Sequence, residues 1–106
     1  MPPGPPTHPT DALLWAQEAI ASNPRRCILD THVYKRLRQR RISERSLWTA
    51  IRSATLCVSY APERAPLANG TSWRITGPDE DGEETSVGVE TFIDHLGRRL
   101  LIITVF

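Results

Sequence analysis

A change of hydrophobic period near the middle of the chain limits its fold more than any other feature of the sequence. Before this point apolar residues recur at helical spacing, as at Leu13, Ala16 and Ile20, which is typical of amphipathic helices. After it they alternate with polar residues, as at Trp73 and Ile75, which is typical of strands with one buried face. The sequence therefore predicts an α+β fold, with N-terminal helices packed on one face of a C-terminal antiparallel β-sheet.

Cap residues predict three helices in the first half of the chain. Short side chains with an oxygen atom accept hydrogen bonds from the free N–H groups of a helix start. The residues expected to do this are Thr10, Asp30 or Thr31, and Ser43. The pair Asn23-Pro24 should end the first helix, because the residue before a proline disfavours helical dihedral angles. The second helix should run through Arg40.

Five segments have the composition of strands, and turns are expected at Asn69-Gly70 and over residues 77–82. The segments are Arg26–Leu29, Thr55–Tyr60, Ser72–Thr76, Thr85–Ile93 and Arg99–Phe106. Alternation places Arg74 and Glu90 on the sheet face opposite the buried one. The side chains expected on the buried face are Trp73, Ile75, Val87, Val89, Thr91, Ile93, Leu101, Ile103 and Val105.

The chain of 106 residues is long enough for one hydrophobic core. We expect a flexible Pro-rich arm over residues 1–9 and a single domain over residues 10–106. The N-terminus lacks the charged and apolar regions of a secretory signal, and no apolar run is long enough to span a membrane. These features predict a cytoplasmic protein.

The sequence predicts neither a metal site nor a cofactor. Cys27 and Cys57 lie in apolar segments, so we expect buried thiols and no disulfide. No histidine has ligand spacing with either cysteine. The acidic segment Asp79–Glu84 faintly resembles a calcium loop, but the further ligands at regular spacing are missing. We expect it to be a solvated connection.

Charge is distributed unevenly, which the formal net charge of +1 conceals. Residues 25–45 contain eight Arg or Lys and two acids, whereas residues 79–94 contain seven acids and no base. Within the basic segment, His32, Arg36 and Arg40 are four residues apart and would stack along one helix face. Like charges at this spacing repel, so the stack indicates an anionic partner. The ordinary alternative is a solvated arginine face.

These residue types suit RNA cleavage without a metal ion. That reaction needs a base for the 2′-hydroxyl, a cation for the developing phosphorane charge and an acid for the leaving oxygen. Histidine titrates near neutrality, and arginine holds phosphate through a fixed fork. The candidate catalytic residues are therefore His32, Arg36, Arg40 and Arg74, and the candidate RNA-binding residues are Lys35, Arg38, Arg41 and Arg45. The second proton-transfer group stays open among Tyr60, Glu63 and Glu90, with Thr104 as a possible residue of the site floor.

The segment His32-Val33-x-x-Arg36-Leu37-x-x-Arg40-x-Ile42-Ser43 is similar to the signature of a widespread bacterial domain-of-unknown-function family. Members of this family typically read His-Ala-x-x-Arg-Met-x-x-Arg-Gly-Ile-Ser. The later Asn69-Gly70-x-x-Trp73-Arg74 and the terminal Ile102–Phe106 also resemble its closing strands. The resemblance covers about residues 28–106. Val33 and Arg41 stand where the family usually has Ala and Gly, and the acidic connection 79–84 is denser than usual.

This family is grouped with RelE-, BrnT- and MqsR-type toxins, many of them encoded beside an antitoxin. The resemblance implies a RelE-like fold, an RNA substrate such as ribosome-bound mRNA, and a protein antitoxin. The first interpretation is therefore a metal-independent endoribonuclease toxin of a bacterial toxin-antitoxin system. The alternative is a non-catalytic module that binds nucleic acid or an acidic protein through its basic helix face, and a purely structural scaffold is the third.

Overall fold

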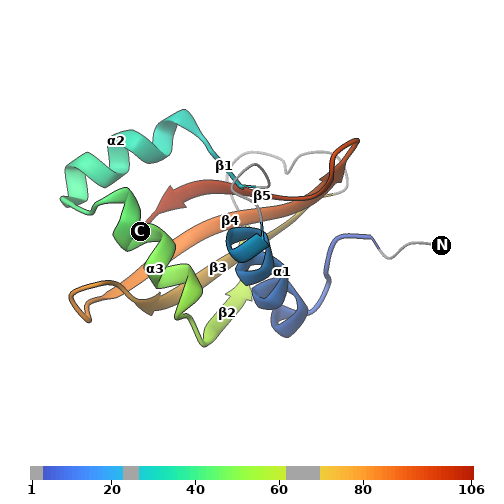
Figure 1. Cartoon of the computed structure of the whole chain (residues 1–106), viewed down its shortest axis with the longest axis horizontal. Helices are drawn as coiled ribbons and strands as arrows, with labels where there is room; N and C mark the ends of the chain where they lie inside the picture. The colour runs from blue at the N-terminus through green and yellow to red at the C-terminus, as the bar shows by residue number, and fades with distance from the viewer. Residues whose placement is uncertain (1–3, 23–26, 62–69) are drawn as a thin grey trace.

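The computed structural model describes residues 4–22, 27–61 and 70–106, which form three helices and five strands (Figure 1). In chain order these are α1 (Pro9–Ser22), β1 (Cys27–Leu29), α2 (Thr31–Arg40), α3 (Glu44–Arg52), β2 (Leu56–Ser59), β3 (Thr71–Pro78), β4 (Glu84–Asp94) and β5 (Gly97–Val105). The predicted α+β class is confirmed. The predicted helix end at Asn23-Pro24, the strand start at Arg26 and Asn69 of the predicted turn lie outside the described residues. No described helix is long and apolar enough to cross a membrane.

One five-stranded sheet has the order β1-β5-β4-β3-β2. The strands β2 to β5 form the predicted antiparallel meander. However, β1 pairs in parallel with β5, with Ile28 opposite Leu101. The sheet is therefore mixed, and the prediction of an antiparallel sheet holds for β2 to β5 but not for β1. A strand of three residues carries too little alternation to show which neighbour it pairs with.

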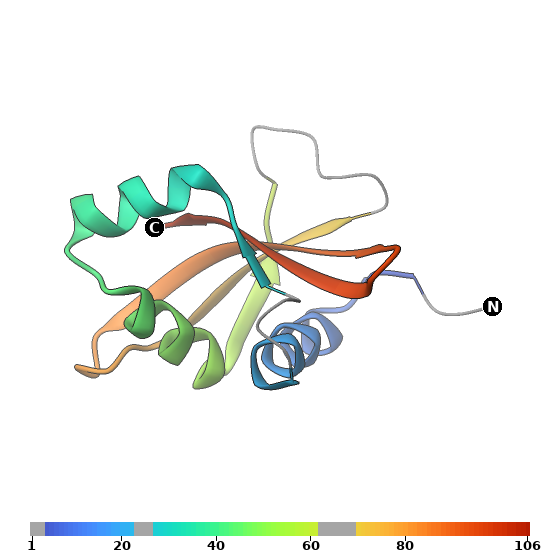
Figure 2. The same ribbon diagram turned by 45° about the horizontal axis from the view of Figure 1, so that its top comes forward.

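The helices do not all cover the same face, which corrects a second part of the prediction. In both views α1 and α3 lie against one face of the sheet, whereas α2 lies beyond the β5 edge (Figures 1 and 2). Only Val33 and Leu37 of α2 are buried, so α2 seats a narrow apolar stripe on the edge of the core. The buried apolar core comprises Ala12, Ala16, Ala19, Val33, Leu37, Leu47, Ile51, Ala54, Trp73, Ile75, Val87, Val89, Leu100, Ile102 and Val105.

A β-bulge decides which residues of β5 face the core. Gly88 pairs with Thr104, but the next residue, Val89, pairs with Ile102, so Ile103 is the extra residue of the bulge. The buried side chains are therefore Leu100, Ile102 and Val105. The prediction of Leu101 and Ile103 in the core is wrong, because simple alternation counted back from Val105 does not allow for the extra residue. Ile93 was also expected to be buried, but it is 40% exposed near the end of β4.

Two of the three predicted caps are present. The Asp30 side chain accepts a hydrogen bond from the His32 N–H, and the Ser43 side chain accepts one from the Ser46 N–H. The first helix instead begins at Pro9, since proline has the dihedral angle and the missing donor that suit a first helical position. The Thr10 N–H donates to His8 Nδ1 at 3.2 Å, so Thr10 lies inside the first turn.

The second half of the predicted arm is attached to the sheet. Pro6 is buried, and the Thr71 hydroxyl donates to its carbonyl oxygen at 2.8 Å. The same hydroxyl oxygen accepts from Trp73 Nε1 at 3.0 Å and lies 2.7 Å from the Thr91 hydroxyl. Thr71 thereby connects the arm with two strands.

The helix α2 ends in a strained backbone conformation. Arg41 has φ 55° and ψ 42°, and it is the non-glycine residue with positive φ among the described part of the chain. Its N–H still closes the helix by donating to the carbonyl oxygens of Leu37 and Arg38. Glycine is the usual residue at this position because a Cβ atom is disfavoured in the left-handed region.

Replacing Arg41 by Gly should therefore stabilise the protein. Relief of the left-handed conformation is partly offset by the greater freedom of glycine in the unfolded chain, and the net gain should be about 0.5–1 kcal/mol. Arg40→Gly removes the same charge inside the helix and should cost about 0.5–1 kcal/mol. Urea unfolding followed by circular dichroism measures both. Equal losses in the two variants would contradict the assignment of strain to Arg41.

Candidate nucleic-acid interface

The basic helix α2 is held at its start by the Asp30 cap, whose carboxylate oxygen lies 3.1 Å from the His32 backbone nitrogen. This cap places the exposed His32 side chain in the first turn. The helix contains no Asp or Glu. Its exposed cations include Lys35, Arg38 and Arg40, while Arg36 is half-buried.

Successive residues of an α-helix are rotated by about 100°, so the buried stripe of α2 divides its surface into two flanks. Tyr34, Arg38 and Arg41 lie on the flank that faces α3, because they line cavities that also contact the start of that helix. His32, Arg36 and Arg40 follow the helical period along the opposite flank. That second flank therefore lies away from the cavities beside α3.

Arg36 contains one of three side-chain atoms among the described residues that are buried without a hydrogen-bond partner. These atoms are Arg36 Nε, Ser72 Oγ and Arg99 Nε. A buried donor without a partner costs about 1–3 kcal/mol, so such an atom calls for an explanation. The described ion pairs join Arg45 to Glu80, Arg98 to Glu18 and Arg99 to Asp94, and none of them involves α2.

The sheet face that α1 and α3 do not cover, called the open face below, carries a second cation, Arg74 of β3. Its side chain is exposed, although Ser72, Glu90 and Thr104 on the same face are buried. Its guanidinium carbon lies 4.2 Å from the centre of the Phe106 ring, a cation–π contact. The Phe106 ring meets Tyr60 edge-on, with ring centres 5.2 Å apart and planes at 86°. Sheet register places Gly88 directly between Arg74 and Thr104. These residues form a cationic and aromatic cluster on one face.

Gly88 makes room for this cluster. A Cβ atom there would lie 3.0 Å from Thr104 Cγ2, 3.4 Å from a Tyr60 ring carbon and 3.5 Å from a Phe106 ring carbon. The two rings therefore lie directly on the backbone of β4. The sequence analysis did not single out Gly88 or Phe106. The available signal was a glycine inside an alternating strand, which often marks a close approach.

Two further predicted site residues lie beside this cluster. Thr104 is 9% exposed next to Gly88, and Glu90, two residues along β4 on the same face, is 3% exposed. The remaining predicted site residues lie elsewhere. Arg45 lies on α3 and forms a 2.8 Å ion pair with Glu80 of the acidic turn. Glu63 lies outside the described residues. Between Arg74 and α2, the described residues contain no hydrogen bond or ion pair.

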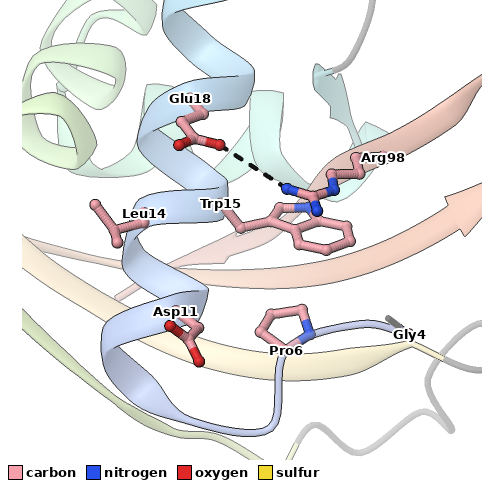
Figure 3. A pocket seen from close by; sticks show the side chains of 7 residues that line it. All are labelled: Gly4, Pro6, Asp11, Leu14, Trp15, Glu18 and Arg98. Atoms are coloured by element: carbon pink, nitrogen blue, oxygen red, sulfur yellow. Dashed lines mark ion pairs between the residues drawn. The ribbon is translucent and has the colours of Figure 1, made fainter. Parts of the chain in front are cut away.

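A cavity of about 300 Å³ lies between α1 and the arm (Figure 3). Figure 3 shows Arg98 over the ring of Trp15, with 4.9 Å between the guanidinium carbon and the ring centre. Arg98 also approaches Glu18 to 4.0 Å. The cation and the aromatic ring of this cavity are thus already paired with each other.

The two cysteines are free thiols, half-buried on β1 and β2. Desolvation by burial raises the pKa of each to about 11, although the nearby Arg99 charge opposes this at Cys27. A thiol with such a pKa is a poor nucleophile at neutral pH. Among the described residues, no group of three or more His, Cys, Asp or Glu could hold a metal ion.

Comparisons with known proteins returned no relatives. No protein-family model matches the chain, and neither the curated proteins nor the solved structures contain a match. The functional inference is therefore carried by the residues of the chain and their geometry.

The raised thiol pKa values make a kinetic prediction. At pH 8 a group with a pKa near 11 is about 0.1% thiolate, against roughly a quarter for a free cysteine. Reaction with Ellman's reagent should therefore be at least about a hundredfold slower than with free cysteine, and should accelerate about tenfold per pH unit up to pH 10. Fast labelling of the native protein at pH 8 would contradict this. The denatured chain, which should react at the free-cysteine rate, is the control.

Proposed function

We propose that this chain is a metal-independent endoribonuclease, which binds RNA along the outer flank of α2 and across the open face of the sheet. The cations of α2, a helix without Asp or Glu, are the observation that carries the proposal. Phosphate oxygens match the fork of an arginine such as the half-buried Arg36. Arg74 supplies a second, exposed guanidinium on the open face.

In the proposed reaction the 2′-hydroxyl oxygen attacks the adjacent phosphorus, and the bond to the 5′-oxygen breaks. The products are a 2′,3′-cyclic phosphate and a free 5′-hydroxyl. Arg36 and Arg74 stabilise the charge that develops on the phosphorane. His32 transfers one proton at the exposed start of α2. We assign the second proton to Tyr60, which lies in the cluster with Arg74.

The aromatic pair favours unpaired RNA over a duplex. Tyr60 and Phe106 lie on the open face beside Arg74, and aromatic rings and guanidinium planes stack with bases that are not held in a helix. An RNA strand bound here would contact cations through its phosphates and rings through its bases.

The resemblance of residues 32–43 to the bacterial toxin-associated family supports the same proposal. It further implies a RelE-like fold, a cytoplasmic site of action, ribosome-bound mRNA as a substrate and a protein antitoxin. The fold, the site of action, the substrate and the antitoxin that the resemblance implies are all part of the proposed function.

A non-catalytic RNA-binding module is the second candidate function. His32 is exposed, and among the described residues its side chain has no hydrogen-bond partner to orient it. A catalytic histidine usually has a second group that fixes its tautomer and direction. The binding contacts of Arg36 and Arg74 do not depend on such a group.

Cleavage assays with purified chain and a single-stranded RNA should separate the two candidates. Wild type should release a 2′,3′-cyclic phosphate end in the presence of EDTA. His32→Ala should abolish cleavage while changing RNA affinity by less than about threefold. Arg36→Ala should lower the rate by about a hundredfold or more, since one lost transition-state donor costs on the order of 2.7–4 kcal/mol. Arg36→Lys should recover only part, because a point charge does not replace the fork.

Growth arrest on expression in bacteria, with folding checked by circular dichroism, extends the test to ribosome-bound mRNA. If wild type binds RNA with a steep salt dependence but neither cleaves it nor slows growth, with and without ribosomes, the binding module replaces the enzyme. If RNA does not bind at all, both candidates fail.

A further inference from the structure

A groove runs along the flank of α2 that faces α3, on the other side of this helix from the proposed RNA contacts. It consists of two adjoining cavities, of about 600 and 410 Å³, which share Tyr34 and Glu44 in their walls. The larger one is lined by Ile20, Cys27, Ile28, Leu29, Tyr34, Glu44, Trp48 and Arg52. The smaller one continues along Arg38 and Arg41 at the end of α2.

The larger cavity follows the free edge of the sheet. It touches all three residues of β1, Cys27 to Leu29. Because consecutive strand residues point to opposite faces, a cavity that touches three in succession lies along the strand's edge. In the described sheet β1 is the outermost strand, with β5 as its single partner.

The backbone register shows which groups this edge offers. The Asp30 N–H donates to the Ile102 carbonyl oxygen at 3.0 Å, toward β5. Since alternate residues of a strand direct their backbone groups to opposite sides, the N–H groups of Cys27 and Leu29 point away from β5. Unpaired edge groups of this kind are a template for a further strand.

The side chains around the groove have a definite chemistry. Its apolar wall includes Ile28, 38% exposed, and Tyr34, 48% exposed, together with the half-buried Trp48. Its charged residues are Arg38, Arg41 and Arg52 against Glu44. An occupant that complements the groove is therefore apolar on one side and acidic on the other.

We infer that this groove binds an extended, acidic segment of a partner protein, which adds a strand to the free edge of β1. Its backbone pairs with Cys27 and Leu29, its apolar side chains pack against Tyr34 and Trp48, and its carboxylates meet Arg38 and Arg41. Main-chain hydrogen bonds supply affinity in this mode of recognition, and the pockets and charges supply specificity. The inference does not depend on the RNA contacts proposed for His32, Arg36 and Arg74, and it assigns Arg38 and Arg41, two of the candidate RNA-binding residues, to the protein partner instead.

Selection of phage-displayed random dodecapeptides on the immobilised full chain tests the inference. The enriched peptides should alternate apolar residues with Asp or Glu. Titration of one synthetic selected peptide into the ¹⁵N-labelled chain should protect the amides of Cys27 and Leu29 from hydrogen exchange. The Ile28 amide, which faces β5, should change little and serves as the internal control.

Charge reversal on α2 provides matched variants. Arg41→Glu and Arg38→Glu should each weaken binding of the peptide at least tenfold. Lys35→Glu, a reversal on the same helix but outside the groove, should change it by less than twofold. Binding of the peptide beside Trp48 should change the fluorescence of this residue. Trp48→Phe keeps an aromatic ring in the wall, so the variant should retain binding but lose this fluorescence change.

The inference would be overturned if no peptides are enriched, or if the enriched peptides lack acidic residues. Peptide binding without protection of the Cys27 and Leu29 amides would also overturn it, as would equal losses of peptide affinity in the Lys35 and Arg41 variants. Protection of both amides in a concentration-dependent dimer of the free chain would assign the edge to a second copy. Protection by a single-stranded RNA oligonucleotide would assign it to nucleic acid. Either result would also overturn it.

Discussion

The bulge at Ile103 is the constraint on which both faces of this sheet depend. Before it, β5 turns Leu100 and Ile102 into the core, and after it the same strand turns Val105 inward and Thr104 outward. Without the extra residue one end of β5 would present the wrong face. The bulge therefore allows a single strand to complete the apolar core and to carry part of the open face. Gly88, opposite the irregularity, leaves space for the rings that lie there.

The narrow apolar stripe of α2 explains where this helix lies. The helix buries two apolar side chains, which is too narrow a stripe to cover a sheet face. It therefore lies against the β5 edge, where both flanks stay accessible. Repulsion among its cations would be costly in a buried helix, but solvent screens it at an edge. One flank of this basic helix thus lines the groove beside α3, and the other carries His32, Arg36 and Arg40.

Local chemistry made much of the fold predictable from the sequence. The caps at Asp30 and Ser43, the alternation in β3 and the order of helices and strands all follow from rules that act over a few residues. The parallel pairing of β1 and the bulge in β5 do not, because each depends on which distant strand lies alongside. The strand β1 is also too short to carry a pattern. The wrong assignment of Leu101 and Ile103 follows directly from this limit.

The candidate site likewise contains residues that the sequence predicts and contacts that it does not. Helical spacing gave the shared flank of His32, Arg36 and Arg40, since it depends only on the period of one helix. The partners of Arg74 were not predictable, because Phe106 and Tyr60 reach it from two other segments through sheet register. The strain at Arg41 was also hidden, although the usual glycine at that place in the similar family was an indication. Sequence spacing therefore identified the cations better than their surroundings.

The hydroxyl of Thr71 links the attachment of the arm to the pairing of two strands. Its contacts with Trp73, Thr91 and Pro6 draw on β3, β4 and the arm at once. Because Thr91 lies opposite Thr71 in the register of β3 and β4, pairing of these strands fixes the hydroxyl that holds Pro6. Trp73 donates to the same oxygen atom, so its indole ring is a natural fluorescent reporter of the attachment of the arm.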